Sequence, residues 1–423
     1  MTRILNVWWQ RRLVGRLSQD RHGELGFVYS TEWLREGDDA HALSASLPRR
    51  AEAYSRRECG PFFSGLLPEE GQRDAVARLL GVSRGNDFAL LDRLGGDVAG
   101  ALELLPPGAS PTSSSADEQP HPLEQEQLAA LLDALPMRPM LADEEGLRLS
   151  LAGAQPKLPV VLVNGEIALP IPGQATTHIL KPPITRFPDT VENEAFVMRL
   201  AQSIGLHAAP VEPRMARHRK FLLIERYDRT TSRTDTTDTV RRIHQEDFCQ
   251  ALGIWPHRKY AGEGGPTLRD CFALLRRMAT RPAVEVLKLL DAAIFNLVAG
   301  NADAHGKNFS LLYSDDGTCL APLYDLLATI AYPELSPKLA MKIGKRATLE
   351  EMNARGWELF AVESGLGQPL VRRRVAEISA AVAAKAREVA GALEDEGLDA
   401  EALSNLAEMI AGRSMRCARS VRR

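Results

Sequence analysis

The stretch that decides the fold is "GNADAHGKNFSLLY", which runs from Gly300 to Tyr313. It places an Asp, a His, a Lys and two Asn residues directly before the apolar run Phe-Ser-Leu-Leu-Tyr. A buried helix has no need of so many polar side chains, and a solvent-exposed loop does not normally end in an apolar run. The pattern therefore indicates a chemical role for these polar residues, above all for Asp303 and Asn308.

Asp303 and Asn308 are five residues apart, which is the D-x-x-x-x-N spacing of a protein-kinase catalytic loop. In such a loop the carboxylate orients the attacking hydroxyl and accepts its proton, while the amide oxygen reaches Mg²⁺. A third oxygen ligand follows in "LAPLYDLL", where Asp325 ends an apolar, strand-like run. Mg²⁺ uses few carboxylates and keeps substrate phosphates and waters, so Asn308 and Asp325 are suitable ligands.

Either Asp alone is explained as well by a helix cap or a turn. Both together, with Asn308 between them in the order that kinases use, favour the catalytic interpretation.

A phosphate-binding loop is expected upstream, in "SLAGAQPK" from Ser150 to Lys157. Gly153 and its small neighbours Ala152 and Ala154 let backbone N–H groups approach an anion. A plain β-turn is the alternative explanation for this short segment.

Lys181 ends the predicted strand "THILK" and resembles the strand-borne lysine that contacts ATP phosphates, although a solvated strand-end lysine is the alternative. Glu192 and Glu194 follow at the start of a predicted helix, where they are either partners of Lys181 or ordinary N-terminal helix charges. "FLLIERYD" is a predicted buried strand, and its end, Glu225 to Tyr227, is the expected hinge that reads adenine through its backbone.

The composition is that of a globular protein: 423 residues, 44% hydrophobic and 25% charged. This length allows two or three domains. The net charge of −3 gives no general attraction to nucleic acid, so any basic contact surface must be local. The five cysteines are scattered without a CxxC pair, which argues against a disulfide framework or a zinc site. With no signal-like N-terminus and no apolar stretch of about 18 residues, we expect a soluble, cytoplasmic protein with no membrane contact.

The elements along the chain predict an α+β, two-lobed, protein-kinase-like fold, with a mixed α/β N-terminal lobe and a mainly helical C-terminal lobe. We expect a subdomain at 1–140 with a Ser/Pro-rich loop at 106–122, a β-rich nucleotide-binding part at 141–240, and a helical part at 241–423. Within the β-rich part, the Asn-Gly pair at 164–165 predicts a hairpin. The polar run 230–239 is expected to be a mobile loop.

Six segments in this order resemble the HipA family, whose members are serine/threonine kinases acting as toxins of bacterial type II toxin–antitoxin modules. The segments are "RLSLAGAQPKLPV", "HILKPP", "ENEAFVMRLAQSIGL", "FLLIERYDR", "NADAHGKNFS" and "APLYDLL". The N-terminal "VWWQRRLVGRL" and "GLLPEE" are also similar to that family, so the resemblance covers about residues 1–415.

The resemblance implies ATP and Mg²⁺ as cofactors and Asp303 as the catalytic base, with Asn308 and Asp325 as metal ligands. It also implies autophosphorylation at Ser150, which ejects the phosphate loop and switches the kinase off. The implied nucleotide-binding residues are Ala152, Gly153, Ala154, Gln155, Pro156, Lys157, Lys181, Glu225, Arg226, Tyr227, His305, Gly306, Lys307, Asn308, Tyr324 and Asp325.

The resemblance further implies a small helix-turn-helix antitoxin, similar to HipB, as a partner, and operator DNA bound through that complex. The implied protein substrate belongs to the translation machinery, an aminoacyl-tRNA synthetase being the family's example. The C-terminal "GRSMRCARSVRR" places arginines at threefold spacing, a basic stripe on a helix that could contact DNA phosphates or remain a solvated tail. These arginines are Arg413, Arg416, Arg419 and Arg422, with Arg423 beside them.

Two other functions remain open at this point. A small-molecule phosphotransferase could use the same Asp, Asn and Asp residues, and a degenerate kinase could serve only as an antitoxin- and DNA-binding co-repressor. The intact Asp303, Asn308 and Asp325 argue against the degenerate kinase, and Ser150 favours the protein kinase through the resemblance.

Overall fold

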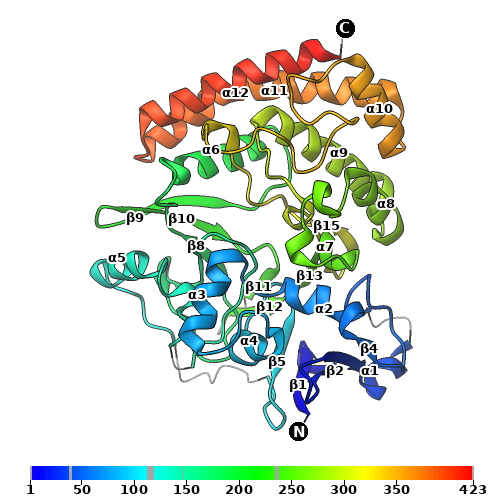
Figure 1. Cartoon of the computed structure of the whole chain (residues 1–423). Coiled ribbons are helices and arrows are strands. Elements are labelled where there is room, and N and C mark those ends of the chain that lie inside the picture. Colours follow the sequence, from blue (N-terminus) through cyan, green and yellow to red (C-terminus); the bar gives the residue numbers. More distant parts are fainter. Residues whose placement is uncertain (1, 38–40, 112–118, 145, 234–237, 422–423) are drawn as a thin grey trace. The chain divides into compact units, whose positions relative to one another are not determined.

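The computed structural model describes residues 2–421 apart from 38–40, 112–118, 145 and 234–237. The chain divides into two compact units (Figure 1). Unit 1 comprises Met1–Pro182, Met215–His257 and Leu312–Ser314, and unit 2 comprises Pro183–Arg214, Arg258–Leu311 and Asp315–Arg423. In the described part of the chain, no helix combines the length and the apolar character needed to cross a bilayer.

Unit 1 begins with an antiparallel sheet in the order β4-β3-β2-β1-β5. Strands β1 and β2 form a hairpin, with Gln10 and Arg11 at positive φ between them. Such a turn matches the right-handed twist of the strands it joins. The strands are β1 (Arg3–Trp9), β2 (Arg12–Gln19), β3 (Leu25–Tyr29), β4 (Tyr54–Ser55) and β5 (Leu102–Leu105).

Alternate residues of β1 point into the core, so Leu5, Val7 and Trp9 are buried while their neighbours are not. Phe62 and Phe63 of helix α2 (Arg56–Gly65) belong to the same apolar cluster. The helices of this region are α1 (Thr31–Arg35), α2 (Arg56–Gly65), α3 (Glu70–Leu80) and α4 (Asp87–Leu94).

A second sheet, in the order β7-β6-β8-β10-β9, forms the rest of the β-rich part. Asn164 and Gly165 both have positive φ between β6 and β7, which confirms the predicted hairpin. Leu128 and Leu132 of α5 share one apolar cluster with Leu158 of β6. The elements are α5 (Gln125–Ala134), η2 (Pro139–Leu141), β6 (Leu158–Val163), β7 (Glu166–Ala168), β8 (His178–Lys181), β9 (Val211–Ala216) and β10 (Arg219–Glu225).

The polar run 230–239 was expected to be a loop, and this expectation was wrong for its described residues. Two antiparallel strands, β11 (Arg229–Arg233) and β12 (Asp238–Arg242), include most of it. Residues 234–237 and, in the predicted loop 106–122, residues 112–118 lie outside the described part. Threonine has a high strand propensity, so a polar run rich in it is compatible with paired strands. Unit 1 also contains β13 (His244–Asp247) and α7 (Phe248–Ala251).

Unit 2 is mainly helical, as predicted for the C-terminal part of the chain. Helices α6 and α9 are largely buried, and α11 and α12 pack along each other (Figure 1). The helices are α6 (Thr190–Ser203), α8 (Leu268–Met278), α9 (Pro282–Ala299), α10 (Ala354–Ser364), α11 (Gln368–Asp395) and α12 (Ala400–Ser420). Two of the remaining short elements, η3 (Pro256–Arg258) and β14 (Ser310–Ser314), have residues in both units. The others are η4 (Ala261–Glu263), η5 (Gly306–Asn308), β15 (Gly317–Leu320) and η6 (Thr329–Ala331).

A buried cluster of charges joins distant segments of unit 1. The carboxylate of Asp97 pairs with Arg226 at 3.1 Å, with Arg229 at 2.8 Å and with Arg242 at 3.1 Å. Asp228 pairs with Arg226 at 2.8 Å. Burial opposes ionisation of Asp97, but the guanidinium groups outweigh it and hold the pKa of this carboxyl well below its ordinary value.

We expect Asp97→Asn to destabilise the protein by about 3–5 kcal/mol, because removing one partner leaves buried guanidinium charges uncompensated. Urea denaturation followed by fluorescence measures this change. The matched control is Asp133→Asn, which removes an exposed carboxylate that pairs with Arg219 at the surface and should change stability little. Equal midpoints for Asp97→Asn and the wild type would show that the cluster contributes no net stability.

Candidate functional site

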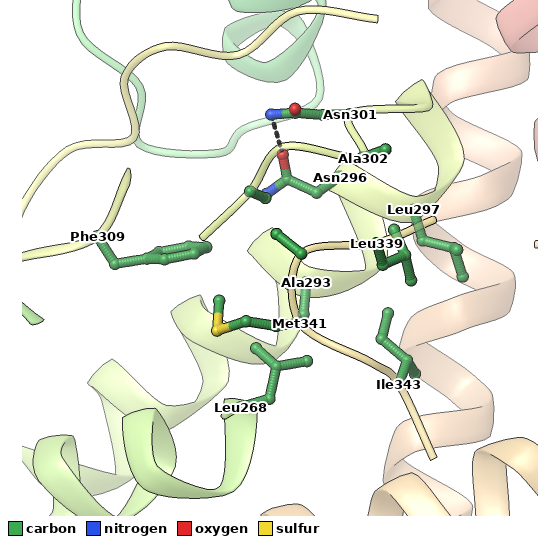
Figure 2. Close-up of a pocket in the computed structure, with 12 residues that line it drawn as sticks. Leu268, Ala293, Asn296, Leu297, Asn301, Ala302, Phe309, Leu339, Met341 and Ile343 are labelled. Atoms are coloured by element: carbon green, nitrogen blue, oxygen red, sulfur yellow. Dashed lines mark hydrogen bonds between the residues drawn. The ribbon is translucent and has the colours of Figure 1, made fainter. Parts of the chain in front are cut away.

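The end of α9 positions the loop that contains Asp303. The helix stops at Gly300, whose φ of 80° is the left-handed conformation that glycine adopts at helix ends. Asn301 then donates from Nδ2 to Oδ1 of Asn296 at 2.8 Å, as Figure 2 shows. The backbone N–H of Ala302 donates to Oγ1 of Thr329 at 2.8 Å. These bonds fix the residues before Asp303, which is itself exposed.

Asn308 and Asp325, predicted as metal ligands, lie side by side in unit 2. Nδ2 of Asn308 donates to Oδ2 of Asp325 at 2.9 Å, and Oδ1 of Asn308 accepts the N–H of His305 at 3.1 Å. Asp325 has a φ of 57°, the left-handed conformation that Asp and Asn tolerate better than most residues. The structure therefore brings this pair together although 17 residues separate it in sequence.

The donor set here fits a hard divalent cation that keeps several non-protein ligands. Asp325 offers a carboxylate, and Oδ1 of Asn308 keeps one lone pair besides the hydrogen bond that it accepts from His305. Mg²⁺ is commonly held by so few protein groups together with phosphates and waters. Among the residues that the structure describes, no three His, Cys, Asp or Glu side chains gather as a metal cluster.

The other residues predicted around Asn308 shape the same loop. Oη of Tyr324 donates to the carbonyl of Lys307 at 2.6 Å and lies 2.8 Å from Oγ of Ser310. His305 is buried, and its ring meets the ring of Tyr260 edge-on, with centroids 5.3 Å apart. Gly306 and Lys307 are buried within η5.

The predicted phosphate loop, from Ala152 to Lys157, lies in unit 1. Nζ of Lys157 donates to the carbonyl of Ala152 at 2.7 Å, closing the loop across Gly153. Gly153 has a φ of 122°, a conformation that residues with a side chain rarely adopt, so this turn favours glycine. Ala154 lies between these residues, and Pro156 leaves the loop one backbone donor short. Gln155 donates from Nε2 to the carbonyl of Pro182 at 3.3 Å.

Ser150 is fully buried just before this loop. Its Oγ donates to the carbonyl of Leu66 at 2.7 Å, and its N–H donates to the carbonyl of Asp97 at 3.0 Å. A kinase could reach this hydroxyl only after the segment has moved out of its place.

Lys181 and the predicted hinge lie on neighbouring strands of unit 1. Lys181 is buried at the end of β8, opposite Leu222 of β10. At the end of β10, Glu225 is exposed, and Oη of Tyr227 donates to Oε1 of Gln245 at 2.8 Å. Arg226 belongs to the buried ion cluster, and its N–H donates to the carbonyl of Thr177 at 2.9 Å. The sequence "ERYD" does not indicate that Arg226 is buried in an ion cluster.

Fewer arginines are exposed in the C-terminal basic stripe than the threefold spacing predicts. Arg413 is buried on α12 and donates to the carbonyls of Leu297 and Val298 at the end of α9, so neither alternative, a DNA contact or a solvated tail, holds for this residue. Helix ends leave such carbonyls without intrahelical donors, and a long basic side chain satisfies them. Arg416 and Arg419 are exposed, whereas Arg422 and Arg423 lie outside the described residues.

A small pocket in unit 2 adjoins the Asp303 loop (Figure 2). Its volume of about 20 Å³ suits a water-sized occupant and is far too small for a nucleotide. Its lining combines apolar side chains with two asparagines: Leu268, Ala293, Asn296, Leu297, Asn301, Ala302, Ala304, Phe309, Leu339, Ala340, Met341 and Ile343.

Two stretches of the chain match models of known protein families. Residues 149–389 match the model of the HipA-like C-terminal domain, and residues 5–105 match that of the HipA N-terminal domain. A candidate kinase of Sinorhizobium fredii, Y4mE, is 63% identical over 97% of this chain and 98% of its own length. The serine/threonine-protein kinase toxin HipA of Shewanella oneidensis is 33% identical over 84% of this chain and 82% of its own length.

The fold agrees with a solved structure. A chain from the complex of Shewanella oneidensis HipA, HipB and operator DNA is similar to this one with a TM-score of 0.81. The sequence identity is 30%, over 99% of this chain and 97% of that chain.

Proposed function

This chain belongs to the HipA family of serine/threonine kinases and has their kinase-like fold, and we propose that it is a toxin that transfers the γ-phosphoryl group of ATP to a protein of the translation machinery. Its kinase activity implies the use of ATP. The observation that carries the proposal is the arrangement in unit 2, where Asn308 is hydrogen-bonded to Asp325 on a loop that also presents Asp303.

In the proposed reaction, Asp303 orients a serine or threonine hydroxyl and accepts its proton. The hydroxyl oxygen bonds to the γ-phosphorus while the bond from that phosphorus to the bridging oxygen breaks, and ADP leaves with the electron pair. Mg²⁺ bound by Asn308 and Asp325 would supply positive charge beside the phosphate oxygens. Asp303 is exposed, as a residue that meets a protein substrate must be.

We propose that some of the remaining predicted residues bind the phosphates of the nucleotide and that others bind its adenine. We assign the phosphates to the loop from Ala152 to Lys157, to Lys181 and to the backbone from His305 to Lys307, with Tyr324 supporting that backbone. We assign adenine to Glu225 and Tyr227, since the N–H of Arg226 is already hydrogen-bonded.

We propose the binding partners of this chain from its membership of the HipA family. The solved relative is a complex of HipA with HipB and operator DNA, and we propose a small helix-turn-helix antitoxin and operator DNA for this chain. The exposed Arg416 and Arg419 of α12 are the basic residues of the predicted stripe that could meet DNA phosphates. An aminoacyl-tRNA synthetase is the proposed class of protein substrate.

We expect Asp303→Asn to slow phosphoryl transfer about 10²–10⁴-fold, the usual contribution of a positioned base, or about 3–5 kcal/mol of activation free energy. Its affinity for ATP should stay within a few-fold of the wild type, and growth arrest on expression should vanish. Radiolabel transfer from ATP and colony counts measure these effects. The control is Asp316→Asn, an exposed aspartate between β14 and β15.

Transfer at the wild-type rate by Asp303→Asn would remove this residue from the mechanism. A wild-type protein that transfers phosphate but never slows growth would instead keep the kinase and reject the toxin.

We expect Asp325→Asn to lose the Mg²⁺ dependence of nucleotide binding, because it removes the only carboxylate of the proposed metal pair. Asparagine tolerates the φ of 57° at this position, so the backbone should not change. Calorimetry with a non-hydrolysable ATP analogue, with and without Mg²⁺, measures the effect. Equal affinities of the wild type under both conditions would contradict the metal site.

We expect mass spectrometry after incubation with Mg²⁺ and ATP to find phosphate on Ser150 in the wild type but not in Asp303→Asn. A phosphate of about −2 charge cannot return to the buried place beside Leu66. Hydrogen exchange of residues 148–157 should therefore become faster once Ser150 is modified. Phosphate on other residues alone, with Ser150 unmodified, would reject this assignment.

A further inference from the structure

Tyr260 lies against the proposed catalytic base. Its Oη donates to Oδ1 of Asp303 at 2.9 Å, and its ring packs edge-on against His305 of the same loop. We propose that Tyr260 is a positioning residue that holds the Asp303 carboxylate in the orientation needed for phosphoryl transfer. This inference rests on the proposed function, in which Asp303 is the base.

The segment that carries Tyr260 is a tight turn built by its own backbone. The carbonyl of Tyr260 accepts the N–H groups of Glu263 and Gly265, each at 2.9 Å. A Cβ on Gly265 would lie 2.7 Å from the carbonyl carbon of Lys259 and 2.7 Å from the carbonyl oxygen of Tyr260. Only glycine allows this approach, so the turn does not depend on the tyrosine hydroxyl.

The same turn is tied by backbone bonds to the residue that precedes Asp303. The N–H of Ala261 donates to the carbonyl of Ala340 at 3.2 Å, and the N–H of Ala340 donates to the carbonyl of Ala302 at 2.7 Å. Ala302 and Ala340 also line the pocket of Figure 2. Tyr260 therefore approaches Asp303 from a support that is already connected to the catalytic loop.

Asp303 is thus held from two directions. Its N–H donates to Oδ1 of Asn301 at 3.2 Å, and its carboxylate accepts the hydrogen bond from Tyr260. A carboxylate has about four lone-pair sites on its two oxygens. A bond to Oδ1 is therefore compatible with a substrate hydroxyl that approaches Oδ2.

The hydroxyl has a chemical effect besides orientation. A hydrogen bond donated to a carboxylate favours the ionised form, which is the form that accepts a proton. Tyr260→Phe removes this donor but keeps the ring against His305, and the backbone bonds of the turn remain. A residue that only supports the turn would leave the ionisation of Asp303 unchanged in this variant, and a positioning residue would not.

The first experiment measures the contact without requiring catalysis. In protein labelled with ¹³C at aspartate carboxyl groups, the Asp303 signal is assigned by its loss in Asp303→Asn. We expect its titration midpoint to move to higher pH in Tyr260→Phe. The control is Tyr54→Phe, which removes a hydroxyl that donates to the carbonyl of Pro48 in unit 1. An unchanged midpoint in Tyr260→Phe overturns the inference.

The second experiment measures transfer of phosphate from ATP to the chain itself. We expect Tyr260→Phe to lower kcat about 10- to 100-fold, since a misplacement of about 1 Å can cost 10²-fold, with KM for ATP unchanged. The acidic limb of the rate profile should move to higher pH by the same amount as the NMR titration. Tyr54→Phe should change neither quantity.

The outcomes separate this inference from the proposed function. If Asp303→Asn loses transfer while Tyr260→Phe keeps the wild-type rate and pH profile, Tyr260 has no positioning role and the base assignment stands. If Asp303→Asn transfers as fast as the wild type, the base assignment fails and the positioning role fails with it.

Discussion

The end of α9 is the constraint on which the geometry of the loop that carries Asp303 depends. A helix leaves its last carbonyls without donors, and here Arg413 from α12 supplies donors for two of them, those of Leu297 and Val298. The chain then turns at Gly300, and the Asn301 amide bonds back to Asn296 in the last turn of the helix. This anchored turn, with the bond from Ala302 to Thr329, fixes where the loop begins.

The buried ion cluster has the corresponding role in unit 1. Charges removed from water are costly unless they are paired and hydrogen-bonded, and Asp97 meets this condition with guanidinium groups from three arginines. The backbone of Asp97 also pairs with the segment that contains Ser150, through the N–H of Ser150. The end of β10 and the segment that contains Ser150 are therefore attached to one residue of the N-terminal subdomain.

Much of the fold was predictable because local patterns determine local conformation. The Asn-Gly pair at 164–165, the short runs "THILK" and "FLLIERYD" and the helical character of the C-terminal part all led to the observed elements. The prediction for 230–239 was wrong because its polar character was taken as a loop signal, while threonine-rich segments are also compatible with paired strands. The prediction for Arg413 was wrong because threefold spacing places residues on one helix face but does not reveal whether another helix covers that face.

By itself, the sequence determined which chemical groups the chain contains and how they are spaced. These are an Asp and an Asn at kinase spacing, a later Asp after an apolar run, and a glycine turn before a lysine. Only the tertiary structure decided which of these groups meet. Asn308 reaches Asp325, Tyr260 reaches Asp303, Arg226 lies in the interior and the Ser150 hydroxyl is buried. The physical reason is that periodicity and spacing report the conformation of neighbouring residues, whereas contacts between distant segments depend on how whole elements pack and which donors their ends leave unsatisfied.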